Sequence, residues 1–166
     1  MGQRENPELT ILHVDGALVV VDKPTGVLSA PGRGNEPAVA DLLREKPEFG
    51  RRAPFRIVHR LDREASGVLL LARTLNAQRA LVTQFAHREV EKTYLALVNG
   101  FVTSDGAVDL NITIDRRRQR MKAVRGRGQT ALTHYAIHER VVGNTLLACR
   151  PVTGRTHQIR VHMAAI

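Results

Sequence analysis

The sequence predicts an α+β fold with a mixed, mostly antiparallel central sheet flanked by helices and loops. Short apolar strand patterns alternate with helix patterns, and several of the predicted strands follow one another directly along the chain. Hydrophobic residues make up 43% and charged residues 25% of the 166 residues, which is ordinary for a globular protein. A chain of this length predicts one domain with a sizeable core.

The first half of the chain predicts three strands and one helix. Residues 18–21 are an apolar, mostly β-branched run, and residues 22–26 read Asp-Lys-Pro-Thr-Gly, so we expect a buried strand followed by a turn. Pro37 suits the first turn of a helix, and the apolar residues that follow it give that helix one buried face. Residues 55–61 predict a strand, and residues 67–72 give the strongest core-strand pattern of the chain.

The second half predicts two helices and four strands. Thr74 is placed to cap a helix that ends near His87, and Thr156 is placed to cap a short final helix. The predicted strands, identified by apolar alternation or short apolar runs, cover residues 93–98, 108–114, 131–137 and 145–149.

The charge balance indicates a polyanionic partner. The chain has 25 Lys and Arg against 16 Asp and Glu, a net charge of +9, and its pI is about 10.9. Nucleic acid explains such a balance best, with an anionic membrane or a merely soluble basic surface as the alternatives. Four Phe, two Tyr and no Trp are too few rings for a single-strand stacking platform, so we expect contacts through phosphates and shape.

Composition also bears on compartment and cofactors. The single cysteine, Cys149, excludes a disulfide framework, and no apolar run or leader sequence predicts a membrane span or secretion, so we expect a cytoplasmic protein with no membrane association. The histidines show no metal-ligand spacing, and no P-loop or dinucleotide-binding glycine motif is present. We therefore predict no metal and no cofactor.

Residues 115–122 form a strongly basic segment between two predicted strands. A hairpin loop with this charge is suited to binding a phosphate backbone, in which case affinity falls steeply with salt. The alternative is a solvated surface loop. The basic side chains of the segment are those of Arg116, Arg117, Arg118, Arg120 and Lys122.

Asp62 is the candidate reactive carboxylate. It lies just before the strongest predicted strand, between Arg60 and Arg63, and nearby guanidinium groups favour the ionised form of a carboxylate. An ionised aspartate can serve as a nucleophile, as a base or as the anchor of a salt bridge. The residues alone leave these three roles open.

Four motifs in order then resemble one family. Residues 59–73 read His-Arg-Leu-Asp-Arg-Glu-Ala-Ser-Gly followed by an apolar strand, which closely resembles the signature of the RluA family of pseudouridine synthases. Ala65 stands where that family usually has Thr. Three further segments resemble, in order, the family's opening strand and turn, its tyrosine strand and its late arginine motif: residues 20–27, 92–100 and 154–162.

The resemblance implies an enzyme that isomerises specific uridines of structured ribosomal or transfer RNA to pseudouridine, with base flipping and without a cofactor. It implies that Asp62 is the catalytic aspartate, that Arg160 pairs with it, and that Tyr94 packs on the target uracil. Arg60 is implied to fill the space left by the extruded uridine. With the basic segment, the predicted substrate-binding residues are His59, Arg60, Arg116, Arg117, Arg118, Arg120 and Lys122.

We expect residues 1–166 to be a single catalytic domain of a monomeric protein. Because the chain stops at Ile166, directly after the last motif, we expect the domain to be incomplete at its C-terminus, and we expect no separate N-terminal RNA-binding domain. One alternative is a non-catalytic RNA-binding module or an inactive fragment of such an enzyme. A glycosidase-like hydrolase using Asp62 and Glu64 is a weaker alternative, because two carboxylates two positions apart do not define a paired acid and base.

Overall fold

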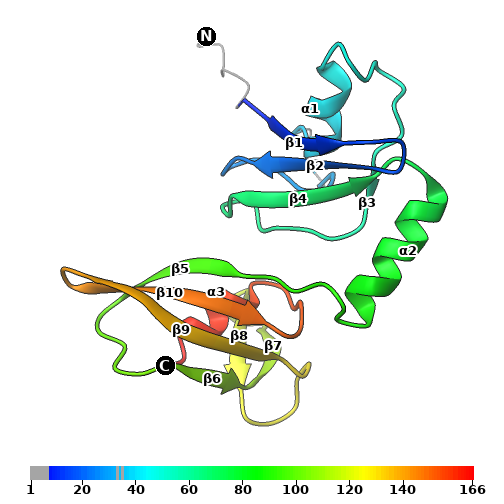
Figure 1. Ribbon diagram of the computed structural model, residues 1–166. Helices are drawn as coiled ribbons and strands as arrows, with labels where there is room; N and C mark the ends of the chain where they lie inside the picture. The colour runs from blue at the N-terminus through cyan, green and yellow to red at the C-terminus, as the bar shows by residue number, and fades with distance from the viewer. Residues whose placement is uncertain (1–7, 33, 35) are drawn as a thin grey trace. The chain divides into compact units, whose positions relative to one another are not determined.

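The computed structural model describes residues 8–32, 34 and 36–166 (Figure 1). Residues 1–7, with which the predicted domain begins, lie outside the described residues. The chain divides into two compact units, one ending at Glu89 and the other comprising Val90–Ile166. Each unit is described by itself below, as the N-terminal unit and the C-terminal unit.

The N-terminal unit is built on a four-stranded antiparallel sheet in the order β1-β2-β4-β3 (Figure 1). The two inner strands are β2 (Leu18–Lys23) and β4 (Gly67–Ala72), which the apolar patterns predicted correctly. The edge strands are β1 (Thr10–Val14) and β3 (Arg56–Ile57). Strand β1 is mostly exposed, so it lacks the apolar alternation that would have revealed it.

The core of this unit lies on one face of the sheet. Val19 pairs in register with Leu71, and Val21 pairs with Leu69, and all four side chains are fully buried. Residues two apart on a strand point to the same face, so these pairs form a continuous apolar layer. This layer fixes the last residue of β2, where the following turn begins, and the first residue of β4, where the loop from β3 ends.

Two helices belong to the N-terminal unit. Helix α1 (Val39–Glu45) begins two residues after Pro37 and buries most of its apolar side chains. Helix α2 (Leu75–Ala86) is capped by Thr74, whose hydroxyl accepts from the Ala77 N–H at 3.1 Å, as its sequence predicted.

The strand predicted over residues 55–61 is wrong beyond its first part. Only β3, at Arg56–Ile57, joins the sheet. The chain then leaves the ladder, because the backbone N–H and C=O of Leu61 bond with the hydroxyl of Ser29 instead of with a strand. The segment that holds Asp62 is therefore a loop between β3 and β4.

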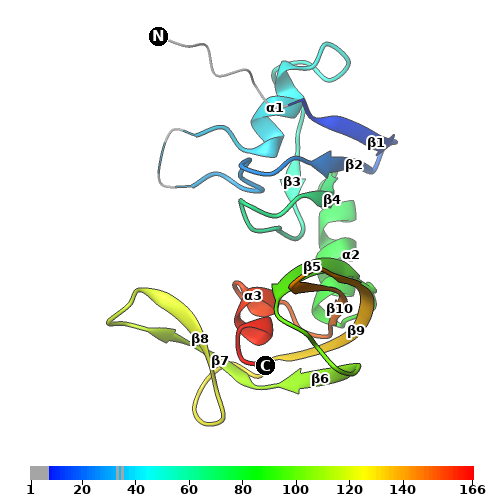
Figure 2. The same ribbon diagram turned by 90° about the vertical axis from the view of Figure 1, so that its left-hand side faces the viewer.

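The C-terminal unit contains a second four-stranded antiparallel sheet and a separate hairpin (Figures 1 and 2). Figure 2 shows the hairpin extending away from the strands of the larger sheet. The sheet order is β5-β10-β9-β6, and the hairpin is β7-β8. The strand bounds are β5 (Tyr94–Asn99), β6 (Gly106–Asp109), β7 (Asn111–Asp115), β8 (Arg120–Val124), β9 (Leu132–Val141) and β10 (Asn144–Pro151).

The predictions for one strand and for the basic segment of this unit need correction. The single strand expected over residues 108–114 is two strands, β6 and β7, which break at Leu110 and join different sheets. The basic segment is not all loop, because Arg120 and Lys122 lie on strand β8 and pair with β7. The alternating pattern that predicted the first strand does not show where the chain changes sheets.

Helix α3 (Gln158–Met163) closes the unit and contacts β8, β9 and β10. Its N-cap residue is His157 in the left-handed conformation, with no side-chain cap, so the cap predicted at Thr156 is wrong. Cys149 is fully buried, and burial raises the pKa of its thiol to about 11, so the thiol stays protonated at neutral pH. None of the helices formed by the described residues is long and apolar enough to cross a membrane.

Candidate active site

Asp62 lies at the centre of the loop between β3 and β4, and its side chain is half-buried. Its own carbonyl accepts a hydrogen bond from the Ala65 N–H at 3.1 Å, which closes a turn directly after it. A loop has no strand or helix ladder to satisfy its backbone, so its position depends on partners from elsewhere. Those partners come from residues 23–29, which comprise the last residue of strand β2 and the turn after it.

Ser29 holds the residue before Asp62. Its buried hydroxyl donates to the Leu61 carbonyl at 2.8 Å and accepts from the Leu61 N–H at 3.0 Å. A hydroxyl is both a donor and an acceptor, so one side chain satisfies both backbone groups of one residue. This contact pins the chain immediately before the candidate catalytic carboxylate.

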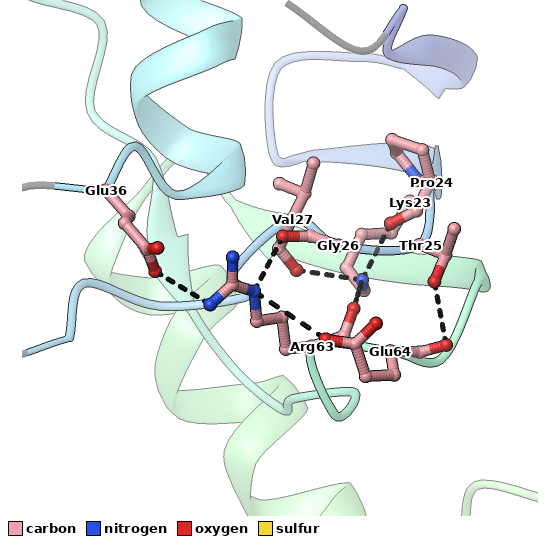
Figure 3. Close-up of polar contacts among 8 residues, drawn as sticks. All are labelled: Lys23, Pro24, Thr25, Gly26, Val27, Glu36, Arg63 and Glu64. Atoms are coloured by element: carbon pink, nitrogen blue, oxygen red, sulfur yellow. Dashed lines mark hydrogen bonds and ion pairs between the residues drawn. The ribbon is translucent and has the colours of Figure 1, made fainter. Parts of the chain in front are cut away.

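Lys23 holds the residue after Asp62 (Figure 3). Its fully buried ammonium donates to the carbonyls of Pro24 at 2.8 Å, Val27 at 2.9 Å and Arg63 at 3.1 Å. An ammonium has three N–H donors, and three carbonyls accept from this one. Lys23 thereby joins the turn after β2 to the loop that contains Asp62.

Further contacts join the same two segments. Gly26 and Arg63 exchange two bonds: the Gly26 N–H donates to the Arg63 carbonyl at 2.9 Å, and Arg63 Nε donates to the Gly26 carbonyl at 3.0 Å. Gly26 has φ of +81°, a conformation that favours glycine. The Thr25 hydroxyl donates to the Glu64 carbonyl at 2.9 Å, and the Arg63 guanidinium pairs with Glu36 at 3.1 Å (Figure 3).

We call this set of contacts from Lys23, Thr25, Gly26 and Ser29 the loop clamp. Its electrostatics centre on Lys23. Burial lowers the pKa of its ammonium, while the negative charges of Glu64 and Asp62 act in the opposite direction. The three carbonyls and the two carboxylates therefore stabilise a buried cation beneath the Asp62 loop.

The other predicted residues of this loop differ in what they contact. His59 accepts a hydrogen bond from the Leu70 N–H at 3.0 Å, and its ring stacks on Phe85 with centroids 4.6 Å apart. These contacts tie the start of the loop to strand β4 and helix α2, which is a supporting role for a residue predicted to bind substrate. The side chain of Arg60 is exposed.

Tyr94 and Arg160 lie in the C-terminal unit. Tyr94 is the first residue of β5, half-buried, and pairs in register with Cys149 of β10. Arg160 lies on α3 with an exposed side chain, and its guanidinium donates to Nδ1 of His157 at 2.7 Å. The left-handed His157 that begins the helix therefore also contacts the predicted functional arginine.

The basic side chains of hairpin β7-β8 are exposed. The carboxylate of Asp115 accepts from the backbone N–H groups of Arg117 at 3.1 Å and Arg118 at 3.2 Å, which shapes the hairpin loop. These bonds, first among them that of Arg118, lower the pKa of Asp115 below its ordinary value. Asp115 is thus ionised and used within the loop, and the arginines around it point into solvent.

The site residues divide between the two units. The N-terminal unit contains His59, Arg60 and Asp62, and the C-terminal unit contains Tyr94, Arg160 and the basic hairpin. In the part of the chain that the structure describes, no three His, Cys, Asp or Glu side chains gather into a set that could hold a metal ion. The N-terminal unit offers the carboxylate of Asp62, and the C-terminal unit offers the phenol ring of Tyr94, the guanidinium of Arg160 and a basic hairpin.

The sequence pattern of the RNA pseudouridylate synthase family matches residues 17–165, which include Asp62, Tyr94 and Arg160. The chain belongs to this family. The resemblance noted from the four motifs is thereby confirmed, and so is the α+β fold with antiparallel sheets.

Individual relatives agree with the family. The chain is 46% identical over 158 residues to ribosomal large subunit pseudouridine synthase D of Xanthomonas campestris pv. campestris, covering 94% of this chain and 48% of the relative. It is 40% identical over 175 residues to the protein of the same name from Nitrosomonas europaea, covering 99% of this chain and 51% of the relative. The chain thus spans about half the length of the curated relatives that it matches.

Solved structures of the pseudouridylate synthase family resemble the chain too. Human RNA pseudouridylate synthase domain containing 1 matches with a TM-score of 0.80 at 28% identity, covering 99% of this chain and 68% of the human chain. Human RNA pseudouridylate synthase domain containing 4 matches with a TM-score of 0.76 at 31% identity, covering 94% of this chain and 64% of the human chain.

Sequence reasoning missed several residues that this member of the pseudouridine synthase family uses to hold its site. Lys23 belongs to the opening motif, but its position before Pro24 predicts only a turn, not a buried ammonium that bonds the Asp62 loop. Ser29 gave no signal, because a serine in a loop is common. The arginine motif does place Gln158, with His157, at the helix start that directs Arg160. It gives no sign of the buried contacts of Gln158 and His162, because these depend on β9, which lies far away in sequence.

Proposed function

We propose that this chain isomerises uridine to pseudouridine in structured ribosomal or transfer RNA. The observation that supports this best is the family match over residues 17–165, which includes the Asp62 loop. The loop clamp adds physical support, because a residue that takes part in bond making must be held in a defined place. The net charge of +9 suits an RNA substrate.

The reaction needs no external reactant. The bond between ribose C1′ and uracil N1 breaks, the uracil turns, and a bond forms between C1′ and uracil C5. The hydrogen on C5 leaves as a proton to solvent, and N1 gains a proton. We propose that Asp62 supplies the negative charge for this step, either as a nucleophile towards the ribose or the base, or as a base that removes a proton.

The remaining site residues have proposed roles around the extruded base. Tyr94 offers a ring face on which a uracil can stack. Arg160 orients the Asp62 carboxylate through a charge-assisted hydrogen bond. Arg60 occupies the space that the flipped nucleotide leaves, and flipping costs least where the base is already unpaired. We propose no cofactor, a monomeric state and a cytoplasmic location.

The basic hairpin is the proposed grip on the RNA backbone. Each phosphate contact that is lost reduces the slope of log affinity against log salt by roughly 0.7 for single strands. Replacing the exposed Arg117 and Arg118 together by Gln should therefore weaken RNA binding and flatten its salt dependence. An unchanged slope in a binding titration would show that the hairpin is only a solvated loop.

The test of the proposed function uses RNA labelled with tritium at carbon 5 of uracil. Pooled ribosomal and transfer RNA lacking modifications serves as substrate, since isomerisation sends that label to water. We expect release by the wild type and none by Asp62→Ala, which should still bind RNA. Glu64→Ala is the matched control, because its exposed carboxylate lies two positions away in the same loop.

The possible outcomes distinguish an isomerase that uses Asp62 from a two-carboxylate reaction and from a non-catalytic RNA-binding module. Release that survives Asp62→Ala would contradict the assignment of Asp62. Loss of release in Glu64→Ala as well would favour a reaction that uses both carboxylates. RNA binding without release by the wild type would favour the alternative, a non-catalytic RNA-binding module.

A further inference from the structure

We infer that Gln158, Thr133 and His162 form a directed chain of hydrogen bonds that fixes α3 and so positions Arg160 for the proposed isomerisation. The inference rests on the proposed function only for the role of Arg160. The hydrogen bonds themselves follow from the geometry of the three residues. We call these three residues the α3 relay, and each of them is a positioning residue.

Helix geometry explains why these residues act together. Gln158 and His162 are four residues apart on α3 and therefore lie on one face of the helix. Both are buried, at 4% and 0% exposed. Arg160 lies two residues from each, about 200° around the helix axis, so it faces away. Fixing the buried face therefore fixes the direction of Arg160.

Two backbone groups determine the orientation of the Gln158 amide. The Arg155 N–H donates at 3.0 Å to Oε1, and Nε2 donates at 3.0 Å to the Leu132 carbonyl. A backbone N–H can only donate and a carbonyl can only accept, so the oxygen and nitrogen of the amide cannot be exchanged. The Thr153 hydroxyl also donates to Oε1, at 2.7 Å.

The direction of the chain continues through Thr133 on β9. Gln158 Nε2 donates to the Thr133 hydroxyl oxygen at 2.9 Å, so the Thr133 proton is available to another acceptor. Nδ1 of His162 lies 2.9 Å from that oxygen. On the other side of the ring, Nε2 lies 3.0 Å from the Leu110 carbonyl, which can only accept. The Leu110 carbonyl requires a proton on Nε2, and burial lowers the pKa of His162 and so disfavours a second ring proton. In the relay that we infer, the ring is neutral, and the lone pair on Nδ1 accepts from Thr133.

The relay connects α3 to two distant parts of the unit. It reaches the first two residues of strand β9, Leu132 and Thr133, and the break between β6 and β7 at Leu110. All its members are buried, where an unsatisfied polar group is costly. A single alternative rotation of α3 would break several of these bonds at once, so the relay selects one orientation.

The test compares two matched threonine variants. Thr133→Val keeps the side-chain volume but removes the hydroxyl from the middle of the relay. Thr145→Val makes the same change at another fully buried threonine of the same sheet. The Thr145 hydroxyl donates to the Gly100 carbonyl and accepts from the Val102 N–H, rather than bonding to α3. Both variants remove a buried hydroxyl that makes two hydrogen bonds, so a general loss of stability from this change is common to both.

We expect the turnover rate of Thr133→Val at saturating RNA to fall about 10²-fold, the size typical of a misplaced catalytic group, with half-saturation little changed. Thr145→Val should keep nearly the wild-type rate, and Thr133→Ser, which retains the hydroxyl, should restore it. Equal rates in the two valine variants would overturn the inference.

Two readouts do not depend on activity. Nitrogen NMR of the His162 ring should show the proton on Nε2 at pH 7; a proton on Nδ1 would overturn the inference. Amide exchange at Val161 and Ala164, which donate within α3, should quicken at least about tenfold in Thr133→Val and stay unchanged in Thr145→Val. Absence of tritium release by the wild type would contradict the proposed function, while these two readouts would still decide whether the relay exists.

Discussion

The Asp62 loop and helix α3 hold their functional residues in two different ways. The loop clamp acts on the backbone: Lys23, Thr25 and Ser29 bond to carbonyl and N–H groups on both sides of Asp62. The α3 relay acts through side chains, because Gln158 and His162 bond Thr133 from one face of the helix.

The difference follows from what each segment already has. A loop leaves its backbone groups unsatisfied, so outside side chains must bond to them before the loop has a fixed path. A helix satisfies most of its own backbone but can still rotate or tilt as a body, so it needs anchors on one face. Irregular segments are thus positioned by bonds to their backbone, and regular ones by bonds to their side chains.

The largest loss of activity should come from changing Asp62 and Arg160, the residues held by the loop clamp and the α3 relay. Asp62→Asn removes the negative charge but keeps the shape, so we expect turnover to fall at least about 10⁴-fold. Arg160→Lys keeps the charge but loses the planar fork of donors, so we expect a loss of about 10²-fold. Tritium release from C5-labelled RNA measures both. An equal loss in the two variants would contradict the separate roles of carboxylate and orienting group.

Removing the buried cation of the loop clamp should cost stability as well as activity. Lys23→Met leaves three carbonyls without their donor, so we expect the free energy of unfolding of the N-terminal unit to fall by about 3 kcal/mol. Amide exchange at β2 and β4 measures it. Lys46→Met, at the end of α1 and outside the clamp, is the control. A Lys23 variant as stable as this control would show that the clamp is held by other contacts.

Ser29 should have a smaller effect on stability than Lys23. Ser29→Ala leaves the Leu61 N–H and C=O unsatisfied in a buried place, so we expect a loss of about 1–2 kcal/mol and roughly tenfold slower turnover. Thr25→Val removes one exposed bond from the other side of Asp62 and should change stability by less than about 0.5 kcal/mol. Thermal unfolding followed by circular dichroism compares them. A larger loss of stability in the Thr25 variant would show that the contact after Asp62 matters more than the Ser29 contact before it.

The smallest expected effect is the pH dependence of stability that His162 of the α3 relay contributes. Burial lowers the pKa of His162 below its ordinary value of 6.5, and the Leu110 carbonyl and the charge of Asp109 only partly oppose this. The unfolded chain therefore binds the proton more readily, so the stability of the C-terminal unit should decrease as pH falls below about 6.5. It should be constant above that pH.

Two aspartates with lowered pKa values do not obscure this pH window. The pKa of Asp15, lowered to about 2 by backbone bonds from Leu18 and Ala17, and that of Asp115 lie below the ordinary value of 3.8. Unfolding of the wild type and of His162→Gln should therefore be compared between pH 4 and pH 8. The variant should be less stable at pH 8 and lack the decline below pH 6.5. The same decline in both proteins would assign it to another group.

Local patterns predicted much of the fold. The apolar runs that became β2 and β4, the Thr74 cap of α2 and the strands β5, β9 and β10 all depend on periodicity and neighbouring residues. Strand β1 and the split at Leu110 were missed, since an exposed edge strand and a change of sheet leave the alternating pattern weak or unbroken.

By itself, the sequence determined the family, because the motifs around Asp62, Tyr94 and Arg160 follow one another in order. Only the tertiary structure decided how those residues are held. Ser29 bonds Leu61 from 32 positions away, Gln158 bonds Thr133 from 25 positions away, and His162 bonds Leu110 from 52 positions away. Such bonds produce no periodic pattern in the sequence, because each needs only one common polar residue. Which group that residue bonds depends on the path of a distant segment of the chain.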